Sequence, residues 1–207
     1  MRRRIGAIRR EEILKATVDV LALKGFARTR VQDVAEQLGV SPALVFYHFD
    51  SKERLLCEAF EFAEQRDLAL LEEAVTAPGT ARERLVGVLR IYLGETAQGW
   101  WRDIDSWSEG RYSAPIRAAS QDIQARWRQG LRRVVTEGVT SGEFACDDPQ
   151  EAVLRIAVLL DGLAVATQVR GSLSRQQAFQ WVCDFAAVEL GLPTAAHRSR
   201  APDPLIK

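Results

Sequence analysis

Cysteine and histidine are scarce in this chain, whose 207 residues include three Cys and two His. Cys57, Cys146 and Cys183 are odd in number and far apart, which speaks against a disulfide framework and against a metal site. The sequence therefore predicts a protein of a reducing compartment that holds no metal and no other cofactor.

Long apolar runs are also missing. No run is long enough to span a bilayer, and the N-terminus lacks the hydrophobic core of a signal peptide. We therefore expect a cytoplasmic protein that does not associate with membranes. A hydrophobic content of 47% and a charged content of 27% are typical of a globular protein with a substantial core.

The alternation of apolar and polar residues that marks half-buried strands is absent, and so are common enzyme motifs. The chain has no paired metal ligands, no Gly-rich phosphate loop and no serine nucleophile turn. We predict an all-α protein of about nine helices that is not an enzyme; an all-helical enzyme stays as an alternative. Apolar spacing, caps and breakers predict helices at about 8–24, 31–38, 42–48, 52–76, 81–97, 114–140, 149–169 and 174–191, with a Trp-rich segment between the fifth and the seventh.

Residues 29–52 contain the most informative pattern. Apolar residues at helical spacing in 31–38 are followed by Gly39, which suits the end of a helix. Ser41 then offers an N-cap oxygen, and Pro42 occupies the first position of a second helix that ends at His48. Val45 and Phe49 point inward on this short helix, which spans roughly 10 Å and leaves its other side free to enter a major groove. The stretch is therefore predicted to be a helix-turn-helix.

The formal net charge is zero, but the charge is unevenly distributed. Residues 1–55 contain 11 Lys and Arg and 7 Asp and Glu, whereas the remainder is net acidic. Five arginines precede the first helix or begin it: Arg2, Arg3, Arg4, Arg9 and Arg10. Such a basic arm can bind backbone phosphate or remain a disordered tail.

The same residues resemble the TetR family of bacterial transcriptional regulators. The resemblance covers residues 8–56 and is carried by Gly25-Phe26, Asp33-Val34-Ala35, Gly39-Val40-Ser41, Phe46-Tyr47-His48-Phe49, Lys52-Glu53 and Leu55. Arg30 departs from the family's usual Thr or Ser, so either Thr29 caps the helix or Arg30 contacts phosphate by its charge. The Leu-Leu-Asp-Gly-Leu run at 159–163 also resembles the betaine-pathway repressors. The resemblance implies a three-helix DNA-binding domain at 1–56, a helical effector and dimerisation domain at 57–192, and a tail at 193–207.

We assign roles in DNA binding by residue type. Lys52, at a helix N-terminus, is expected to bind phosphate, while Tyr47, His48, Thr29 and Ser41 are placed for backbone hydrogen bonds. Ala43, Leu44 and Phe46 can contact thymine methyl groups, and Gln32 or Arg30 is left to read base edges. The candidate DNA-binding residues are Thr29, Arg30, Gln32, Ser41, Pro42, Ala43, Leu44, Phe46, Tyr47, His48 and Lys52.

The Trp-rich segment suggests an effector site. Aromatic faces beside carboxylates can hold a cationic or amphipathic small molecule through cation–π contacts and charge. The candidate effector residues are Phe60, Tyr92, Trp100, Trp101, Asp103, Trp107, Tyr112 and Trp127. The alternative is that these aromatic residues fill the core or a dimer interface.

The helix from Ala152 to Val169 is apolar nearly all round, so it must be buried on several sides. Together with the last helix it can form a four-helix interface around a two-fold axis; the alternative is a monomeric core. The candidate interface residues are Leu159, Gly162, Leu163, Ala166, Phe179, Val182 and Phe185.

These inferences predict a ligand-responsive regulator that binds double-stranded DNA as a homodimer. Reading heads about one DNA turn apart, roughly 34 Å, predict a palindromic operator. The family's usual behaviour implies a repressor released by its ligand. An activator and an architectural, ligand-independent DNA-binding protein stay as alternatives.

Overall fold

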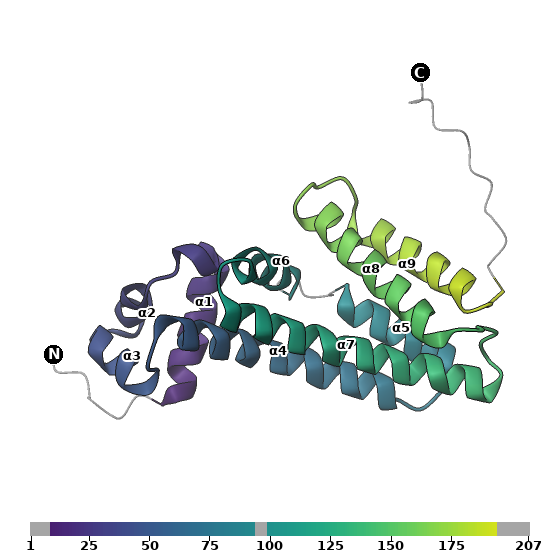
Figure 1. Cartoon of the computed structure of the whole chain (residues 1–207), viewed down its shortest axis with the longest axis horizontal. Helices are drawn as coiled ribbons and strands as arrows, with labels where there is room; N and C mark the ends of the chain where they lie inside the picture. The colour runs from purple at the N-terminus through teal and green to yellow at the C-terminus, as the bar shows by residue number, and fades with distance from the viewer. Residues whose placement is uncertain (1–8, 94–98, 194–207) are drawn as a thin grey trace, which may run out of the picture. The chain divides into compact units, whose positions relative to one another are not determined.

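The computed structural model describes residues 9–93 and 99–193, with the side chains of 99–103 excepted. Within this part of the chain every regular element is an α-helix (Figure 1). The helices are α1 (Arg10–Arg28), α2 (Val31–Leu38), α3 (Pro42–His48), α4 (Lys52–Thr76), α5 (Ala81–Tyr92), α6 (Gly99–Gly110), α7 (Ala114–Ser141), α8 (Pro149–Gln168) and α9 (Arg175–Glu189). The all-α prediction is confirmed. None of these helices combines the length and the apolarity that crossing a bilayer requires.

The chain folds into two compact units. The first unit comprises the described parts of Met1–Glu73 and Gly94–Gln129, and the second those of Ala74–Leu93 and Gly130–Lys207. The long helices α4 and α7 contribute residues to both units. This grouping by packing does not test the functional division after residue 56, which stays a prediction.

The start of the first unit is a small three-helix head completed by the first turn of α4. Its core consists of residues from all four helices that are at most 9% exposed, and Ile13, Val34, Val45, Phe49 and Leu55 among them are 0–1% exposed. Val45 and Phe49 are four residues apart, so they lie on one side of α3 and anchor it. The inward positions predicted for these two side chains are confirmed.

A second apolar cluster lies in the same unit and joins the end of α1 to α4 and α7. Phe26 and Phe60 are each 1% exposed and meet edge to face, with ring centroids 5.9 Å apart. Ile116 and Ile123, two turns apart on α7, complete the contact, and Trp127 packs against it. The long helices are therefore held together by this cluster.

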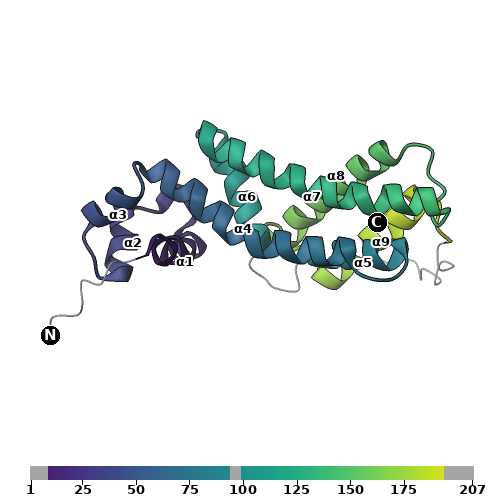
Figure 2. The same cartoon turned by 90° about the horizontal axis from the view of Figure 1, so that it is seen from below.

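In the second unit α9 packs against both α5 and α8, and α8 and α9 lie side by side in Figure 1, whereas α5 and α7 partly cover them in the view of Figure 2. Ile156 and Leu160 on α8 and Val182 and Leu190 at α9 are at most 2% exposed. The nearly continuous apolar sequence of α8 is explained in part by this burial.

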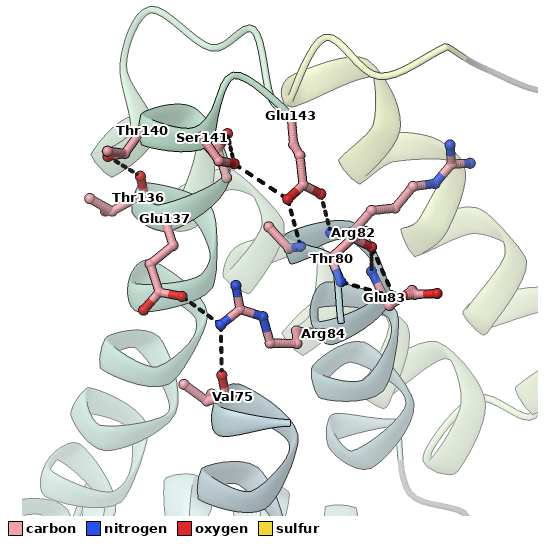
Figure 3. Close-up of polar contacts among 12 residues, drawn as sticks. Val75, Thr80, Arg82, Glu83, Arg84, Thr136, Glu137, Thr140, Ser141 and Glu143 are labelled. Atoms are coloured by element: carbon pink, nitrogen blue, oxygen red, sulfur yellow. Dashed lines mark hydrogen bonds and ion pairs between the residues drawn. The ribbon is translucent and has the colours of Figure 1, made fainter. Parts of the chain in front are cut away.

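Polar contacts tie the ends of three helices together in the second unit (Figure 3). The Glu143 carboxylate, on the turn after α7, accepts hydrogen bonds from the amides of Ala81 and Arg82 at 3.0 and 3.3 Å. Arg84 pairs with Glu137 of α7 at 2.6 Å and donates to the carbonyl of Val75 at the end of α4. Groups that a helix end leaves unpaired are thus satisfied from neighbouring elements.

Most predicted helix boundaries agree with the structure to within two residues. The break predicted at Gly25 is present, where φ is +73°, but the chain resumes a helical turn from Phe26 to Arg28. The fifth helix ends at Tyr92 rather than near Ala97, and 94–98 lie outside the described residues. The basic residues Arg2–Arg4 and the tail predicted at 193–207 lie outside them as well, apart from residue 193.

Candidate DNA-binding surface

The turn between α2 and α3 is built by the residues that the sequence singled out. Gly39 adopts φ +68°, a left-handed conformation that favours glycine, and its amide and that of Val40 cap the last carbonyls of α2. The Ser41 hydroxyl accepts a hydrogen bond from the Leu44 amide at 3.3 Å, and Pro42 follows at the first helical position. The predicted helix-turn-helix is therefore present.

The outer side of α3 carries most of the predicted DNA contacts. Tyr47 is 82% exposed and Phe46 is 46% exposed, although both neighbour the buried Val45. Ser41 and Ala43 are exposed as well, whereas Pro42, Leu44 and His48 are half-buried. The structure therefore brings seven of the predicted residues to one short helix and its cap.

The residues at the start of α2 divide into two groups. Arg30 and Gln32 are exposed, and the Gln32 amide donates to Glu36 at 2.9 Å. Thr29 is 1% exposed and donates its hydroxyl to the carbonyl of Gly25 at 2.7 Å, so its side chain is committed to α1. The cap that Thr29 was predicted to provide for α2 is therefore absent, and the N-cap residue Arg30 provides no side-chain cap either.

Asp33 performs that capping from within α2. Its carboxylate accepts the Arg30 amide at 2.9 Å and pairs with Lys24 of α1 at 2.8 Å. The hydrogen bond from Lys24, followed by that from the Arg30 amide, holds the pKa of the Asp33 carboxyl below its ordinary value. The start of α2 is thereby fixed to α1 by charge as well as by packing.

Lys52 begins α4 and is half-buried, and the Ser51 hydroxyl before it accepts the Arg54 amide at 3.1 Å. A cation at a helix N-terminus combines two features that attract phosphate. Lys52 thus has the environment that its predicted role requires.

Arg10, which the sequence placed in the basic arm, is bound within the head. Its guanidinium donates to the carbonyl of His48 at the end of α3 and pairs with Glu58 of α4. It also lies 4.1 Å from the centre of the Phe49 ring. Because its partners are 38 to 48 residues away in the sequence, a local sequence pattern cannot predict this contact.

The predicted effector residues are distributed over both units. Phe60, Trp107 and Trp127 belong to the first unit and Tyr92 to the second, where its hydroxyl donates to Asp161 at 2.7 Å. Tyr112 is 82% exposed, an unsuitable position for lining an enclosed pocket. The side chains of Trp100, Trp101 and Asp103 lie outside the described residues. The indole N–H of Trp107 is buried and has no hydrogen-bond partner among the residues that the structure describes.

A surface groove of about 460 Å³ lies in the first unit between the starts of α4 and α7. It contains none of the predicted effector residues and includes Cys57, Glu61 and Asp122. Burial, with Glu61 adding its charge, raises the pKa of the Cys57 thiol to about 11. The thiol is therefore protonated at neutral pH and is a poor nucleophile.

The predicted interface residues on α8 and α9 are not equally available to a partner. Leu163 and Val182 are 3% and 0% exposed, so they belong to the core of the second unit. Leu159, Ala166, Phe179 and Phe185 are half-buried, and Gly162 is exposed. Other apolar residues are much more exposed: Leu154 at 50%, Val158 at 62%, Trp181 at 49% and Val188 at 67%.

An anchored short helix with a free outer face, preceded by a tight turn and a capped helix, defines a helix-turn-helix DNA-binding protein. Among such proteins the chain belongs to the TetR family of bacterial transcriptional regulators. The family model "Bacterial regulatory proteins, tetR family" matches residues 13–59, and "BetI-type transcriptional repressor, C-terminal" matches residues 81–191. Both resemblances noted in the sequence are confirmed.

Two curated relatives extend over most of the chain. The HTH-type transcriptional regulator BetI of Rhizobium meliloti is 26% identical over 177 residues, which are 80% of each chain. The nucleoid occlusion factor SlmA of Escherichia coli is 30% identical over 165 residues, 75% of this chain and 80% of SlmA. The first relative is named as a transcriptional regulator and the second as a nucleoid occlusion factor, and neither name describes an enzyme.

Solved structures agree with this assignment. A transcriptional regulator from Saccharomonospora viridis in complex with choline is 31% identical, with a TM-score of 0.73 over 85% of this chain and 94% of the other. A TetR-family regulator from Rhodococcus is 25% identical, with a TM-score of 0.74 over 87% of this chain and 97% of the other. The fold is therefore shared along nearly the whole length of these regulators.

Proposed function

We propose that this regulator is a cytoplasmic repressor that binds a palindromic operator as a homodimer and is released by a small cationic or amphipathic molecule. One observation carries the proposal: α3 has Val45 at 1% and Tyr47 at 82% exposure. A helix anchored on one side and free on the other can lie in a major groove without disturbing its own core.

The proposed DNA-binding set follows from the exposure of each side chain. Tyr47 and Ser41 donate to backbone phosphate, and Lys52 adds charge at a helix N-terminus. Phe46 and Ala43 contact thymine methyl groups, since they carry no polar group that reads a base edge. Gln32 and Arg30 are the proposed polar readers at the start of α2. Thr29 is left out of the set because its hydroxyl is bound to Gly25.

The proposed homodimer uses the outward stripe of α8 and α9. Leu154, Val158 and Gly162 recur every four residues on α8, and Trp181 and Val188 are seven residues apart on α9. Residues at such spacings share one face of a helix. Apolar side chains that are 49–67% exposed on two adjacent helices favour a two-fold four-helix contact.

The effector is proposed to be a cationic or amphipathic small molecule bound by aromatic side chains of the first unit. The S. viridis regulator, which shares the family and the fold, was solved with choline. Trp107 has a buried indole N–H that finds no partner in the described part of the chain, a costly arrangement that a hydrogen-bond acceptor on a ligand would relieve. The proposed aromatic contacts are Phe60, Trp107 and Trp127.

A ligand-independent DNA-binding role is the second candidate. It is favoured by the 30% identity to a nucleoid occlusion factor. The two candidates differ in what a ligand does. A repressor loses its operator when the effector binds, whereas an architectural or occlusion protein keeps its DNA.

Footprinting on the genomic DNA that flanks the gene tests the proposal, with choline as the first effector probe. We expect one protected palindrome, and weaker protection when choline is added. Tyr47→Ala is expected to reduce operator affinity by at least about thirtyfold, since a contact of about 1–2 kcal/mol is lost in each subunit, or about 2–4 kcal/mol in the dimer. Tyr112→Ala is a matched control, because Tyr112 is equally exposed at 82%.

Protection of random fragments as strong as that of genomic ones would contradict operator recognition. Equal losses in Tyr47→Ala and Tyr112→Ala would exclude α3 as the reading helix. A palindrome that stays protected at every choline concentration, with no quenching of tryptophan fluorescence, would exclude a choline-like effector and favour the second candidate.

A further inference from the structure

One side chain from outside the helix-turn-helix reaches its backbone. Asp105 lies on α6, and its carboxylate accepts a hydrogen bond from the amide of Phe26 at 2.9 Å. The contact falls directly after Gly25, which is the non-helical position inside α1. A methyl group at Gly25 would lie only 2.7 Å from the same carboxylate oxygen, so the backbone and the acid are in close approach.

The break in α1 explains why the Phe26 amide needs a partner from elsewhere. Gly25 has φ +73° and ψ 169°, so the Phe26 amide begins a new helical turn. An amide at the start of a helical turn has no acceptor within its own helix. Asp105 supplies that acceptor from a different helix, as a capping residue would do from the same chain segment.

What Asp105 holds is the segment that leads into the DNA-binding helices. The Gly25 carbonyl accepts both the hydroxyl and the amide of Thr29, at 2.7 and 3.2 Å. Arg30 then occupies the N-cap position of α2, while the Phe26 ring packs on Phe60 of α4. The position of this backbone therefore sets where α2 begins and how α1 rests on α4.

Helix α6 is fixed on its other side as well. The hydroxyl of Ser106 donates to that of Ser120 on α7 at 3.1 Å, and both residues are at most 4% exposed. Consecutive residues on a helix point about 100° apart. Asp105 and Ser106 therefore bind α6 to α1 and to α7, and a displacement of α6 must alter at least one of these contacts.

We propose that Asp105 is a positioning residue for the DNA-binding surface, through which the orientation of α2 and α3 depends on α6. The geometry assigns this acid to the backbone of the helix-turn-helix head. The inference rests on the proposed operator binding. It gives an effector bound near Trp107, two residues along α6, a route to the DNA-binding helices.

Three variants of the full-length protein test the inference. Asp105→Ala removes the acceptor, Asp105→Asn keeps a side-chain oxygen that accepts, and Glu109→Ala removes an acid one turn further along α6. For Asp105→Ala we expect exchange of the Phe26 amide to be about tenfold faster and operator affinity to fall roughly fivefold, as expected for loss of a hydrogen bond to a charged acceptor. Affinity for random DNA changes less than about twofold, because phosphate contacts do not require an exact orientation. Asp105→Asn and Glu109→Ala stay close to the wild type.

Gly25→Ala provides a second test that retains the acid. The added methyl group pushes against the carboxylate and disfavours the positive φ, so operator affinity falls as well. In the double variant with Asp105→Ala the combined loss is smaller than the product of the single losses, because the clash has been removed. If Asp105→Ala does not fold, the operator affinity of the single variant Gly25→Ala still tests whether this contact positions the DNA-binding helices.

Two results would overturn the inference: faster exchange of the Phe26 amide with unchanged operator affinity, or an Asp105→Asn protein as impaired as Asp105→Ala. A third result concerns the proposed function instead. If the wild type itself does not distinguish operator from random DNA, operator recognition fails whatever the Phe26 amide does, and the positioning role falls with it.

Discussion

Arginine and aspartate side chains in the head show how the same residue type can serve DNA or the protein itself. Arg10 lies in a basic sequence that suggests phosphate binding, yet its guanidinium is bound to the His48 carbonyl and Glu58. Asp33 is the third residue of α2, where its carboxylate accepts the Arg30 amide and also pairs with Lys24. Charge pattern alone therefore identified the basic region but not the use of each charge.

Replacing Arg10 tests that distinction at the residue scale. Arg10→Ala removes hydrogen bonds and the stacking on Phe49, so the free energy of unfolding should fall by about 1–2 kcal/mol. The salt dependence of DNA binding should stay the same, because the guanidinium is not engaged with phosphate. Urea denaturation and DNA titrations at several salt concentrations measure the two effects.

Arg9→Ala is the neighbouring control, since Arg9 is exposed. A smaller salt dependence of DNA binding in Arg10→Ala, with unfolding unchanged, would show that this arginine belongs to the basic arm after all.

Helix starts that are capped by nearby residues could be predicted well from the sequence. The two helices predicted to begin at about 149 and 174 have local caps: the Asp148 carboxylate accepts the Glu151 amide, and the Ser174 hydroxyl accepts the Gln177 amide. Such caps involve residues within three positions of each other, so the local sequence contains both partners. The cap that Glu143 provides for α5 is different, because its partner is 62 residues away.

That distant cap predicts a dependence of stability on pH. Hydrogen bonds from the amides of Ala81 and Arg82 outweigh desolvation and hold the pKa of the Glu143 carboxyl below its ordinary value of 4.5. A lowered carboxyl pKa stabilises the fold above the unfolded-state value, and this contribution disappears as the pH falls through the folded-state value. Stability should therefore decline below about pH 4.5 by an amount that depends on Glu143.

Glu143→Gln measures this contribution. The variant should be less stable than the wild type at pH 7, and the difference should shrink as the pH is lowered toward 3. Thermal unfolding followed by circular dichroism at several pH values provides the comparison. A difference that stays constant over that range would mean that the ionisation of Glu143 does not stabilise α5.

At the scale of the whole molecule, the exposed face of α8 and α9 is the proposed site of dimerisation. Their sequences are so uniformly apolar that spacing could not separate core from surface. The structure assigns Leu163 and Val182 to the core and leaves Val158 and Trp181 exposed. The proposed homodimer still uses α8 and α9, but the residues proposed to form the contact differ from those predicted from the sequence.

A charge on that face should separate the subunits. Val158→Asp places a carboxylate where apolar side chains of two chains are proposed to meet, and an unpaired buried charge is strongly unfavourable. We expect a monomer with native helical content and at least tenfold weaker operator binding, since paired half-sites are lost. Light scattering coupled to size-exclusion chromatography measures the oligomeric state, and DNA titration measures the operator affinity.

Gln176→Glu is the control, because Gln176 is exposed on α9 outside the apolar stripe and gains the same charge. A Val158→Asp protein that stays dimeric would place the interface elsewhere.

The sequence by itself determined the all-α class, the position of most helix ends and the helix-turn-helix. These features depend on residues within about four positions of one another, and the chain presents those neighbours directly. Only the tertiary structure decided which polar groups are free for DNA and which apolar residues face outward. Arg10 and Asp105 find their partners 38 to 79 residues away, and a distance of that size along the chain becomes a contact only when the helices pack.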